Sequence, residues 1–150
     1  MKHAEELRIL RECIEKMLAH AVEAYPNECC GALFGHDAAS ERGREKPREV
    51  LQIYPLVNRR EDSPRNRFSV NPRDVIKAER TAEKLELSVI GWYHSHPDHP
   101  ARPSEFDRQN AWPWYSYIIV SVQNGVPGEL ASWRLREDCE RFVQEELQEG

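Results

Sequence analysis

The stretch from residue 94 to residue 107 contains His94, His96, Ser104 and Asp107, whose side chains could act together on one metal ion. On a β-strand the side chains alternate between the two faces, so His94 and His96 point the same way and can present two nitrogens to one metal ion. A catalytic zinc ion usually takes three protein ligands and keeps a fourth position for water, so one ligand is still needed. Asp107 is the best candidate for this third ligand, and we expect the function to lie in this stretch.

The residues before the histidines predict the strand that would position them. Residues 87–93 are mostly apolar, with β-branched and aromatic side chains, and Pro97 is expected to end the strand directly after the second histidine. Prolines at positions 97, 100 and 103 then predict an extended loop. Residues 104–107 are typical of a helix start, which would bring Asp107 back toward the histidines.

Each of these residues also has an ordinary structural interpretation. Ser104 with an acid three residues later fits a helix-capping pattern, and capping does not exclude a catalytic role for Ser104. A His-x-His pair alone is more often polar surface or core than a metal site, but its place at a strand end and the nearby Asp107 favour a metal site. His99 could replace one of the other imidazoles, yet it lies between prolines in the loop, so we assign it to the rim.

The motif His94-x-His96, followed after seven residues by Ser104-x-x-Asp107, resembles the signature of the JAMM (also called MPN-plus) metalloproteases. That family also uses a glutamate far upstream. Residues 26–35 resemble the family's segment in residue order and in distance from the histidines, which makes Glu28 the matching glutamate. The resemblance covers most of the chain and implies a single JAMM/MPN domain over residues 1–150.

The resemblance implies an α/β (α+β) fold of the cytidine-deaminase-like JAMM/MPN type, with a mixed, mostly antiparallel, curved β-sheet flanked by helices. Local patterns predict helices at residues 4–21 and 72–85, and strands at residues 30–34, 50–57, 68–70, 117–123 and 130–136. For residues 140–148 the acidic content favours a helix, whereas the resemblance implies a strand paired with the previous one. We favour the strand.

For the site, the resemblance implies one Zn2+ per chain, bound by His94, His96 and Asp107. The ion would activate a water molecule, and Glu28 would accept the proton of this water and return it to the leaving amine. Ser104 would donate a hydrogen bond to the oxyanion as the carbonyl becomes tetrahedral. Taken alone, Glu28 could equally be a solvated loop acid.

The short connections of this sequence resemble those of the stand-alone prokaryotic family members, which are associated with ubiquitin-like sulfur-carrier proteins. We therefore expect the substrate to be an amide bond at the C-terminal Gly-Gly tail of a ubiquitin-like or sulfur-carrier protein. Glycines fit a narrow cleft, and such a tail could also pair with an exposed strand near the metal.

Two other functions are compatible with the fold. One is a metallopeptidase or amidase that acts on unrelated peptides, such as cell-wall fragments. The other is a non-catalytic MPN-type scaffold that binds other proteins. The scaffold is disfavoured, because such relatives lose the metal ligands, whereas this sequence has the full set of site residues.

Composition decides little by itself. At 150 residues and 39% hydrophobic, the chain has the length of one domain with a core. A formal net charge of −5 argues against nucleic-acid binding, although Arg59, Arg60, Arg65 and Arg67 form a basic cluster, which we interpret as a solvated loop. No stretch approaches the roughly 20 apolar residues of a membrane span, so we expect a cytoplasmic protein without a membrane partner.

The cysteines and the aromatic residues leave further alternatives open. The four cysteines form no Cys-x-x-Cys pair, which is typical of a reduced compartment. Cys29 or Cys30 could be a nucleophile beside Glu28, although a buried structural cysteine is the commoner case. Several aromatic residues could line a substrate channel, although such clusters more often belong to the core. These are Trp92, Tyr93, Trp112, Trp114 and Tyr115.

Overall fold

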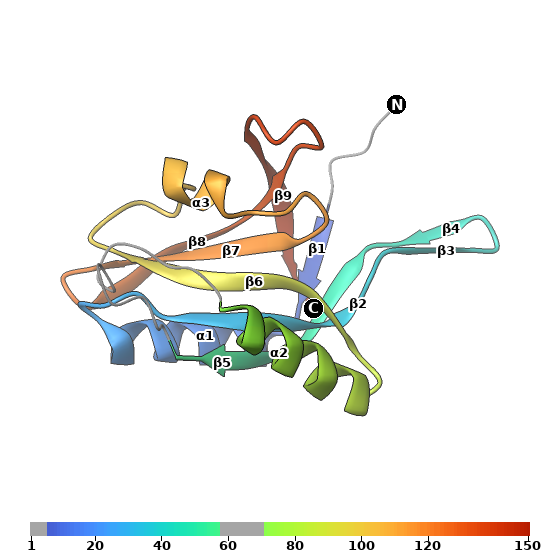
Figure 1. Cartoon of the computed structure of the whole chain (residues 1–150), viewed down its shortest axis with the longest axis horizontal. Coiled ribbons are helices and arrows are strands. Elements are labelled where there is room, and N and C mark those ends of the chain that lie inside the picture. Colours follow the sequence, from blue (N-terminus) through green and yellow to red (C-terminus); the bar gives the residue numbers. More distant parts are fainter. Residues whose placement is uncertain (1–5, 58–70) are drawn as a thin grey trace.

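The structure, a computed structural model, describes residues 6–57 and 71–150 (Figure 1). In chain order the elements are β1 (Glu6–Ile9), α1 (Arg11–Ala24), β2 (Cys30–His36), β3 (Ala39–Glu41), β4 (Arg44–Lys46), β5 (Arg48–Leu56), α2 (Pro72–Lys84), β6 (Ser88–Pro97), α3 (Glu105–Gln109), β7 (Ser116–Gln123), β8 (Val126–Leu135) and β9 (Phe142–Glu149). The predicted strand at residues 68–70, the loop at 58–66 and the arginine cluster lie outside the described residues.

Seven strands form one mixed sheet in the order β1-β5-β2-β6-β7-β8-β9. Four neighbouring pairs are antiparallel, and the pairs β1–β5, β1–β9 and β6–β7 are parallel. Because β1 pairs with both β5 and β9, the two ends of the curved sheet meet and the strands form a closed barrel. The predicted mixed, mostly antiparallel sheet is confirmed, and its closure is an additional feature.

Helices α1 and α2 cover opposite faces of strand β6 (Figure 1). Consecutive residues of a strand point to opposite faces, and Tyr93 packs in a cluster with Met17 of α1, whereas Trp92 packs with Ala82 of α2. The predicted flanking of the sheet by helices is therefore confirmed. In the described part of the chain no helix is long and apolar enough to cross a membrane.

The first predicted helix, residues 4–21, is wrong at its beginning. Residues Glu6–Ile9 form strand β1, and the helix α1 begins only at Arg11. Leu7 and Ile9 are buried whereas Arg8 between them is exposed, which is the two-residue period of a strand. The spacing of Leu7 and Leu10 also fits a helix. Pairing of β1 with β5 and β9 decides the outcome, and it depends on residues far along the sequence.

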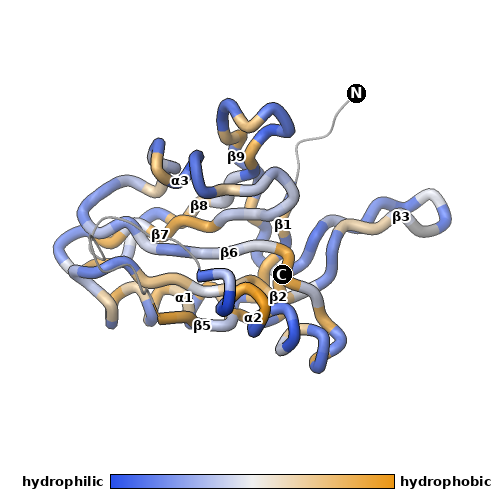
Figure 2. The backbone as a smooth tube through the Cα atoms, in the orientation of Figure 1, coloured by the Kyte–Doolittle hydropathy of each residue, from blue (hydrophilic) through white to orange (hydrophobic). Residues whose placement is uncertain are grey.

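The other predicted elements that fall within the described residues are present with shifted ends. Strands β2, β5, β7 and β8 and helix α2 overlap the predicted ranges. Strand β6 includes Pro97, which was expected to lie just beyond it. The ambiguous segment near the end is strand β9, antiparallel to β8, as favoured above. The hairpin β3–β4 lies outside the predicted elements, projects from the body (Figure 1) and consists mostly of hydrophilic residues (Figure 2).

Gly91 is required for the close approach of β6 and β7. A Cβ atom on Gly91 would lie 2.1 Å from the backbone oxygen of Ser116, and backbone in a central strand has little room to move. We expect Gly91→Ala to lower the free energy of unfolding by about 2 kcal/mol or more, measured by chemical denaturation. Gly128→Ala is the matched control, because the nearest atom to its added Cβ is 3.8 Å away. Equal stability of the two variants would contradict this account.

Candidate metal centre

Strand β6 presents His94 and His96 on the same face, near its carboxyl end. The strand is paired on both sides, with Cys30 of β2 opposite His94 and with Ile119 and Ser121 of β7 next to the two histidines. The two imidazoles converge, and their Nε2 atoms are 3.2 Å apart. His94 is 2% and His96 9% exposed, so both rings lie in a site with little access to bulk water.

Asp107 reaches the histidines from the short helix α3. Its Oδ1 is 3.3 Å from Nε2 of His94, and its Oδ2 is 3.1 Å from Nε2 of His96. The helix start fixes this position, because the Ser104 backbone N–H donates to Asp107 Oδ2 (2.8 Å) and the Asp107 N–H donates to Ser104 Oγ (3.0 Å). The capping interpretation of Ser104 is confirmed. The hydroxyl accepts a hydrogen bond there, which leaves its own proton available to another group.

Glu28 is the second carboxylate beside the imidazoles. It is 3% exposed, and one of its oxygens lies within 4.8 Å of a ring nitrogen of each histidine. Two hydrogen bonds fix the backbone next to it: the Cys29 N–H donates to Ser95 Oγ (2.8 Å), and the Ser95 N–H donates to the Cys29 carbonyl (3.2 Å). The segment that carries Glu28 is thus fastened to the residue between the two histidines.

A second connection holds the loop before Glu28. The Tyr25 hydroxyl lies 2.9 Å from both carboxylate oxygens of Asp98, which follows the histidine strand. The same carboxylate accepts the backbone N–H of Asn124 in the β7–β8 turn at 2.9 Å. Asp98 therefore joins three loops at this end of the barrel, and it restrains the segment that carries Glu28.

The donor set fits a zinc ion. Three atoms bound at about 2.0–2.1 Å to one tetrahedral ion are about 3.3 Å from one another, and the separations among His94 Nε2, His96 Nε2 and the Asp107 oxygens are 3.1–3.3 Å. His96 Nδ1 lies 3.0 Å from the Pro100 carbonyl. Because a carbonyl can only accept a hydrogen bond, a metal-bound His96 would carry its proton on Nδ1 and bind the metal through Nε2.

The two carboxyl groups have opposite electrostatic environments. Burial and the nearby charge of Asp107 raise the pKa of Glu28 to about 9. Burial also opposes ionisation of Asp107, but the charges and hydrogen bonds of His94 and His96 outweigh it and hold the pKa of Asp107 well below its usual range. Such a difference between neighbouring acids is characteristic of sites where one group remains ionised and another exchanges a proton.

Comparison with known proteins agrees with this arrangement. Residues 10–136 match the family described as prokaryotic homologs of the JAB domain. The chain belongs to the prokaryotic JAB family. The resemblance to stand-alone prokaryotic JAMM/MPN proteins is thereby confirmed.

Curated relatives of this JAB protein are named as enzymes. A protein of Haloferax volcanii named desampylase is 30% identical over 123 residues, which cover 79% of this chain and 82% of the relative. A Thermus thermophilus protein named probable TtuB-protein conjugate cleaving protease is 32% identical over 120 residues, covering 80% and 73%. The CysO-cysteine peptidase of Mycobacterium tuberculosis is 30% identical over 130 residues, covering 86% and 82%. The predicted class, a JAMM-type hydrolase, is confirmed.

Solved structures support the fold of this JAB protein. The solution structure of a Desulfitobacterium hafniense protein matches with a TM-score of 0.77 and 35% identity, and covers 96% of this chain and 94% of that one. A protein of Salinibacter ruber matches with a TM-score of 0.71 and 34% identity, covering 95% and 91%. The similarity thus extends over nearly the whole length of both partners.

The remaining candidates lie outside the donor set. The His99 side chain is exposed on the loop, in agreement with its assignment to the rim. Cys29 and Cys30 are buried free thiols. Burial raises the pKa of Cys29 to about 11 and that of Cys30 still further. Both therefore remain protonated near neutral pH, which argues against either thiol as the nucleophile.

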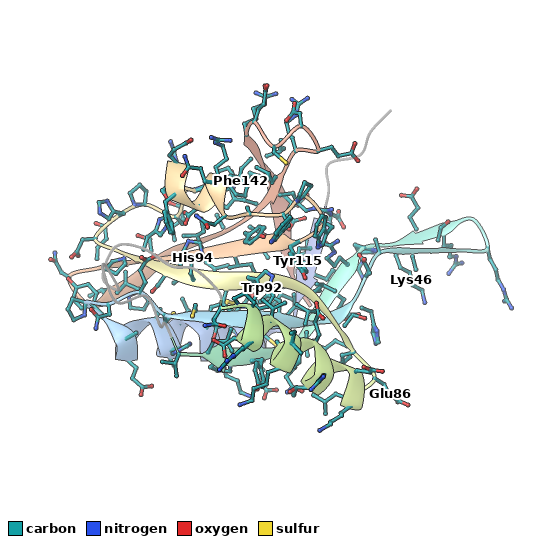
Figure 3. The ribbon with its side chains drawn as sticks, viewed as in Figure 1. Lys46, Glu86, Trp92, His94, Tyr115 and Phe142 are labelled. Carbon is teal, nitrogen blue, oxygen red and sulfur yellow. The ribbon has the colours of Figure 1, made fainter. Side chains whose placement is uncertain are left out.

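The aromatic residues divide between the core and a cavity beside the metal centre. Trp92 and Tyr93 are buried, as the core interpretation predicts, whereas Trp112 and Trp114 are 56% and 55% exposed. The cavity has a volume of about 650 Å³, and its lining includes His94 and Asp107. In Figure 3, Trp92, His94 and Tyr115 lie between helices α2 and α3. The core interpretation is wrong for the two exposed tryptophans.

Ser95 is a site-supporting residue that the motif alone does not reveal. Its place between two candidate ligands on a strand shows only that it points to the opposite face, and its partner Cys29 is distant in sequence. We expect Ser95→Ala to lower the free energy of unfolding by about 1–3 kcal/mol, because it leaves the buried Cys29 N–H without its acceptor. Chemical denaturation would measure this effect.

The matched control is Ser88→Ala, since Ser88 begins the same strand and is exposed. We expect that variant to stay within about 0.5 kcal/mol of the parent. A Ser95→Ala protein as stable as Ser88→Ala would show that the Cys29–Ser95 hydrogen bond does not hold the segment.

Proposed function

We propose that this protein is a zinc metallopeptidase that hydrolyses an amide bond at the C-terminal Gly-Gly tail of a ubiquitin-like or sulfur-carrier protein. The observation that carries the proposal is the donor set of His94, His96 and Asp107, spaced for one tetrahedral ion, with the carboxyl group of Glu28 beside it. These three residues would hold one zinc ion per chain.

Each residue of the site then has a defined task. Bound zinc supplies Lewis-acid polarisation and lowers the pKa of water to about 7. The positive charge of a bound zinc ion would favour the carboxylate form of Glu28, so that Glu28 could accept the proton released from the water and transfer it to the amine as the amine leaves. The Ser104 hydroxyl donates a hydrogen bond to the oxyanion while its oxygen continues to cap helix α3. Asp98 and Ser95 hold the Glu28 segment in place for this transfer.

The substrate class is supported by the relatives and by the resemblance. One relative is named for cleaving a protein conjugate and another for a peptidase activity toward CysO-cysteine. Both relatives are hydrolases that act on ubiquitin-like or sulfur-carrier proteins at their C-terminal tails. We assign the same type of amide bond to this protein.

We place the reaction in the cytoplasm. The four cysteines are all free thiols, and Cys139 is exposed, which suits a compartment that keeps thiols reduced. Carrier proteins with Gly-Gly tails are the partners proposed there, and neither a nucleic acid nor a membrane is part of the proposed function.

Metal content tests the donor set. We expect protein purified without added metal or chelator to contain about one zinc ion per chain, and a His94→Ala/His96→Ala double variant to contain almost none, because two of its three ligands are gone. Elemental analysis by mass spectrometry measures both. A parent protein that binds no zinc, even during titration, would leave a non-catalytic scaffold as the better account.

The role of Glu28 is tested separately from metal binding. We expect Glu28→Gln to retain zinc and fold but to lose roughly a hundred- to ten-thousand-fold in kcat, because only the proton carrier is changed. The assay follows release of an amine from the Gly-Gly carboxyl group of a small ubiquitin-like protein. Glu23→Gln, at an exposed position on α1, is the control with normal turnover. Full activity of Glu28→Gln would remove this residue from the mechanism.

A further inference from the structure

The cavity beside the metal centre has an apolar character. Its floor comes from β6 and β7, and its walls come from the first turns of α2 and from the segment between α3 and β7. The wall residues include Val75 and Ile76 on one side and Trp112 and Trp114 on the other. Among the described residues that line it, Asp107 alone carries a full negative charge, and no lysine or arginine contributes. Such a lining suits an uncharged, apolar ligand group.

The tryptophan wall is held rigidly although its rings are exposed. Trp112 and Trp114 are stacked, with ring centroids 5.1 Å apart. The backbone N–H of Trp112 donates to the Tyr117 hydroxyl at 2.8 Å. The backbone carbonyl of Trp114 accepts from the buried guanidinium of Arg48 at 2.9 Å. Hydrogen bonds thus hold the backbone of both tryptophans, and stacking holds their rings together. A ligand that binds here loses little free energy to ordering of these side chains.

Strand β6 offers little backbone edge to a substrate. It is paired with β2 as far as His94 and with β7 as far as Pro97, so an extended tail cannot pair along β6 before the histidines. A tail that reaches the metal centre therefore crosses the face of the sheet. Contacts with side chains, rather than pairing with β6, must then distinguish one tail from another.

The position of Glu28 indicates which part of the substrate enters the cavity. Glu28 gives its proton to the leaving amine, so the amine lies on the Glu28 side of the metal centre. Among the described residues, His94 and Asp107 border the cavity but Glu28 does not line it. We therefore expect the segment that precedes the scissile carbonyl on the other side of the metal centre, where His94 and Asp107 border the cavity.

We propose that the cavity binds an apolar side chain from the residues immediately before the Gly-Gly pair of the substrate tail, and that the stacked Trp112 and Trp114 are its specificity-determining wall. The proposal rests on the proposed function for the identity of the tail. Tryptophan is well suited to this task, because it supplies a large contact area with little loss of side-chain freedom.

Two synthetic peptides test the preference directly. Both are six residues long and end in Gly-Gly with a free carboxylate. One has leucine and the other serine at the two positions before the glycines, so they differ in apolar surface without a difference in charge. Titration calorimetry with the zinc-loaded protein measures affinity. We expect the leucine peptide to bind at least about tenfold more tightly, and equal affinity for the two peptides would overturn the proposal.

Variants of the wall locate this preference. Trp112→Ala and Trp114→Ala should each reduce the preference for leucine severalfold, whereas Val126→Ala, at a position on β8 that is 65% exposed and outside the cavity lining, should leave it unchanged. With cleavable conjugates, the tryptophan variants should raise KM with little change in kcat. A leucine preference that persists in both tryptophan variants would also overturn the proposal.

The binding data separate this inference from the proposed function. If the protein prefers the leucine peptide through Trp112 and Trp114 but cleaves no conjugate, the specificity-determining wall is supported and the proposed hydrolysis is contradicted. If the protein cleaves conjugates equally well whatever residues precede Gly-Gly, the proposed hydrolysis is supported and the role of the tryptophan wall is contradicted.

Discussion

The antiparallel pairing of β2 with β6 is the interaction on which the candidate site depends. It sets Cys30 opposite His94 and Gly31 opposite Tyr93, and so brings the segment of Glu28 to the histidines from a distant part of the chain. A side chain at position 31 would not fit, because an added Cβ would lie 2.2 Å from the Tyr93 ring. The glycine therefore permits the close approach, and the large buried ring behind the metal centre keeps the two strands in this register.

Strand β6 serves the core and the chemistry at the same time. Its alternation directs Tyr93 and Ser95 toward one side, where they are fully buried, and His94 and His96 toward the other. The Tyr93 hydroxyl lies 2.8 Å from Nδ1 of His20 on helix α1, so even the core side is anchored by a polar contact. Ligand orientation thus follows from a strand whose opposite face is already fixed by packing, which is a rigid base for a metal site.

How far the sequence reveals the molecule depends on the distance over which each signal acts. The strand of His94 and the capped helix start at Asp107 are local patterns, and both elements are present in the structure. Glu28 has no local signal and was reached only through the family resemblance. The β-conformation of Leu7 depends on pairing with β5 and β9, and the exposure of Trp112 depends on the surrounding elements. Hydrophobic periodicity within one segment reveals neither which distant strands it pairs with nor which elements cover its side chains.

Closure of the barrel also bears on how the molecule behaves at high concentration. An open sheet ends in a row of unpaired N–H and C=O groups, which can pair with a neighbouring molecule and begin fibrous aggregation. Here β1 fills the gap between β5 and β9. In the part of the chain that the structure describes, every strand of the barrel is paired on both sides over at least part of its length. The β3–β4 hairpin lies outside the barrel, and its strands are only three residues long and carry charged residues. The closed arrangement of strands that positions the candidate metal centre therefore also limits edge-to-edge self-association.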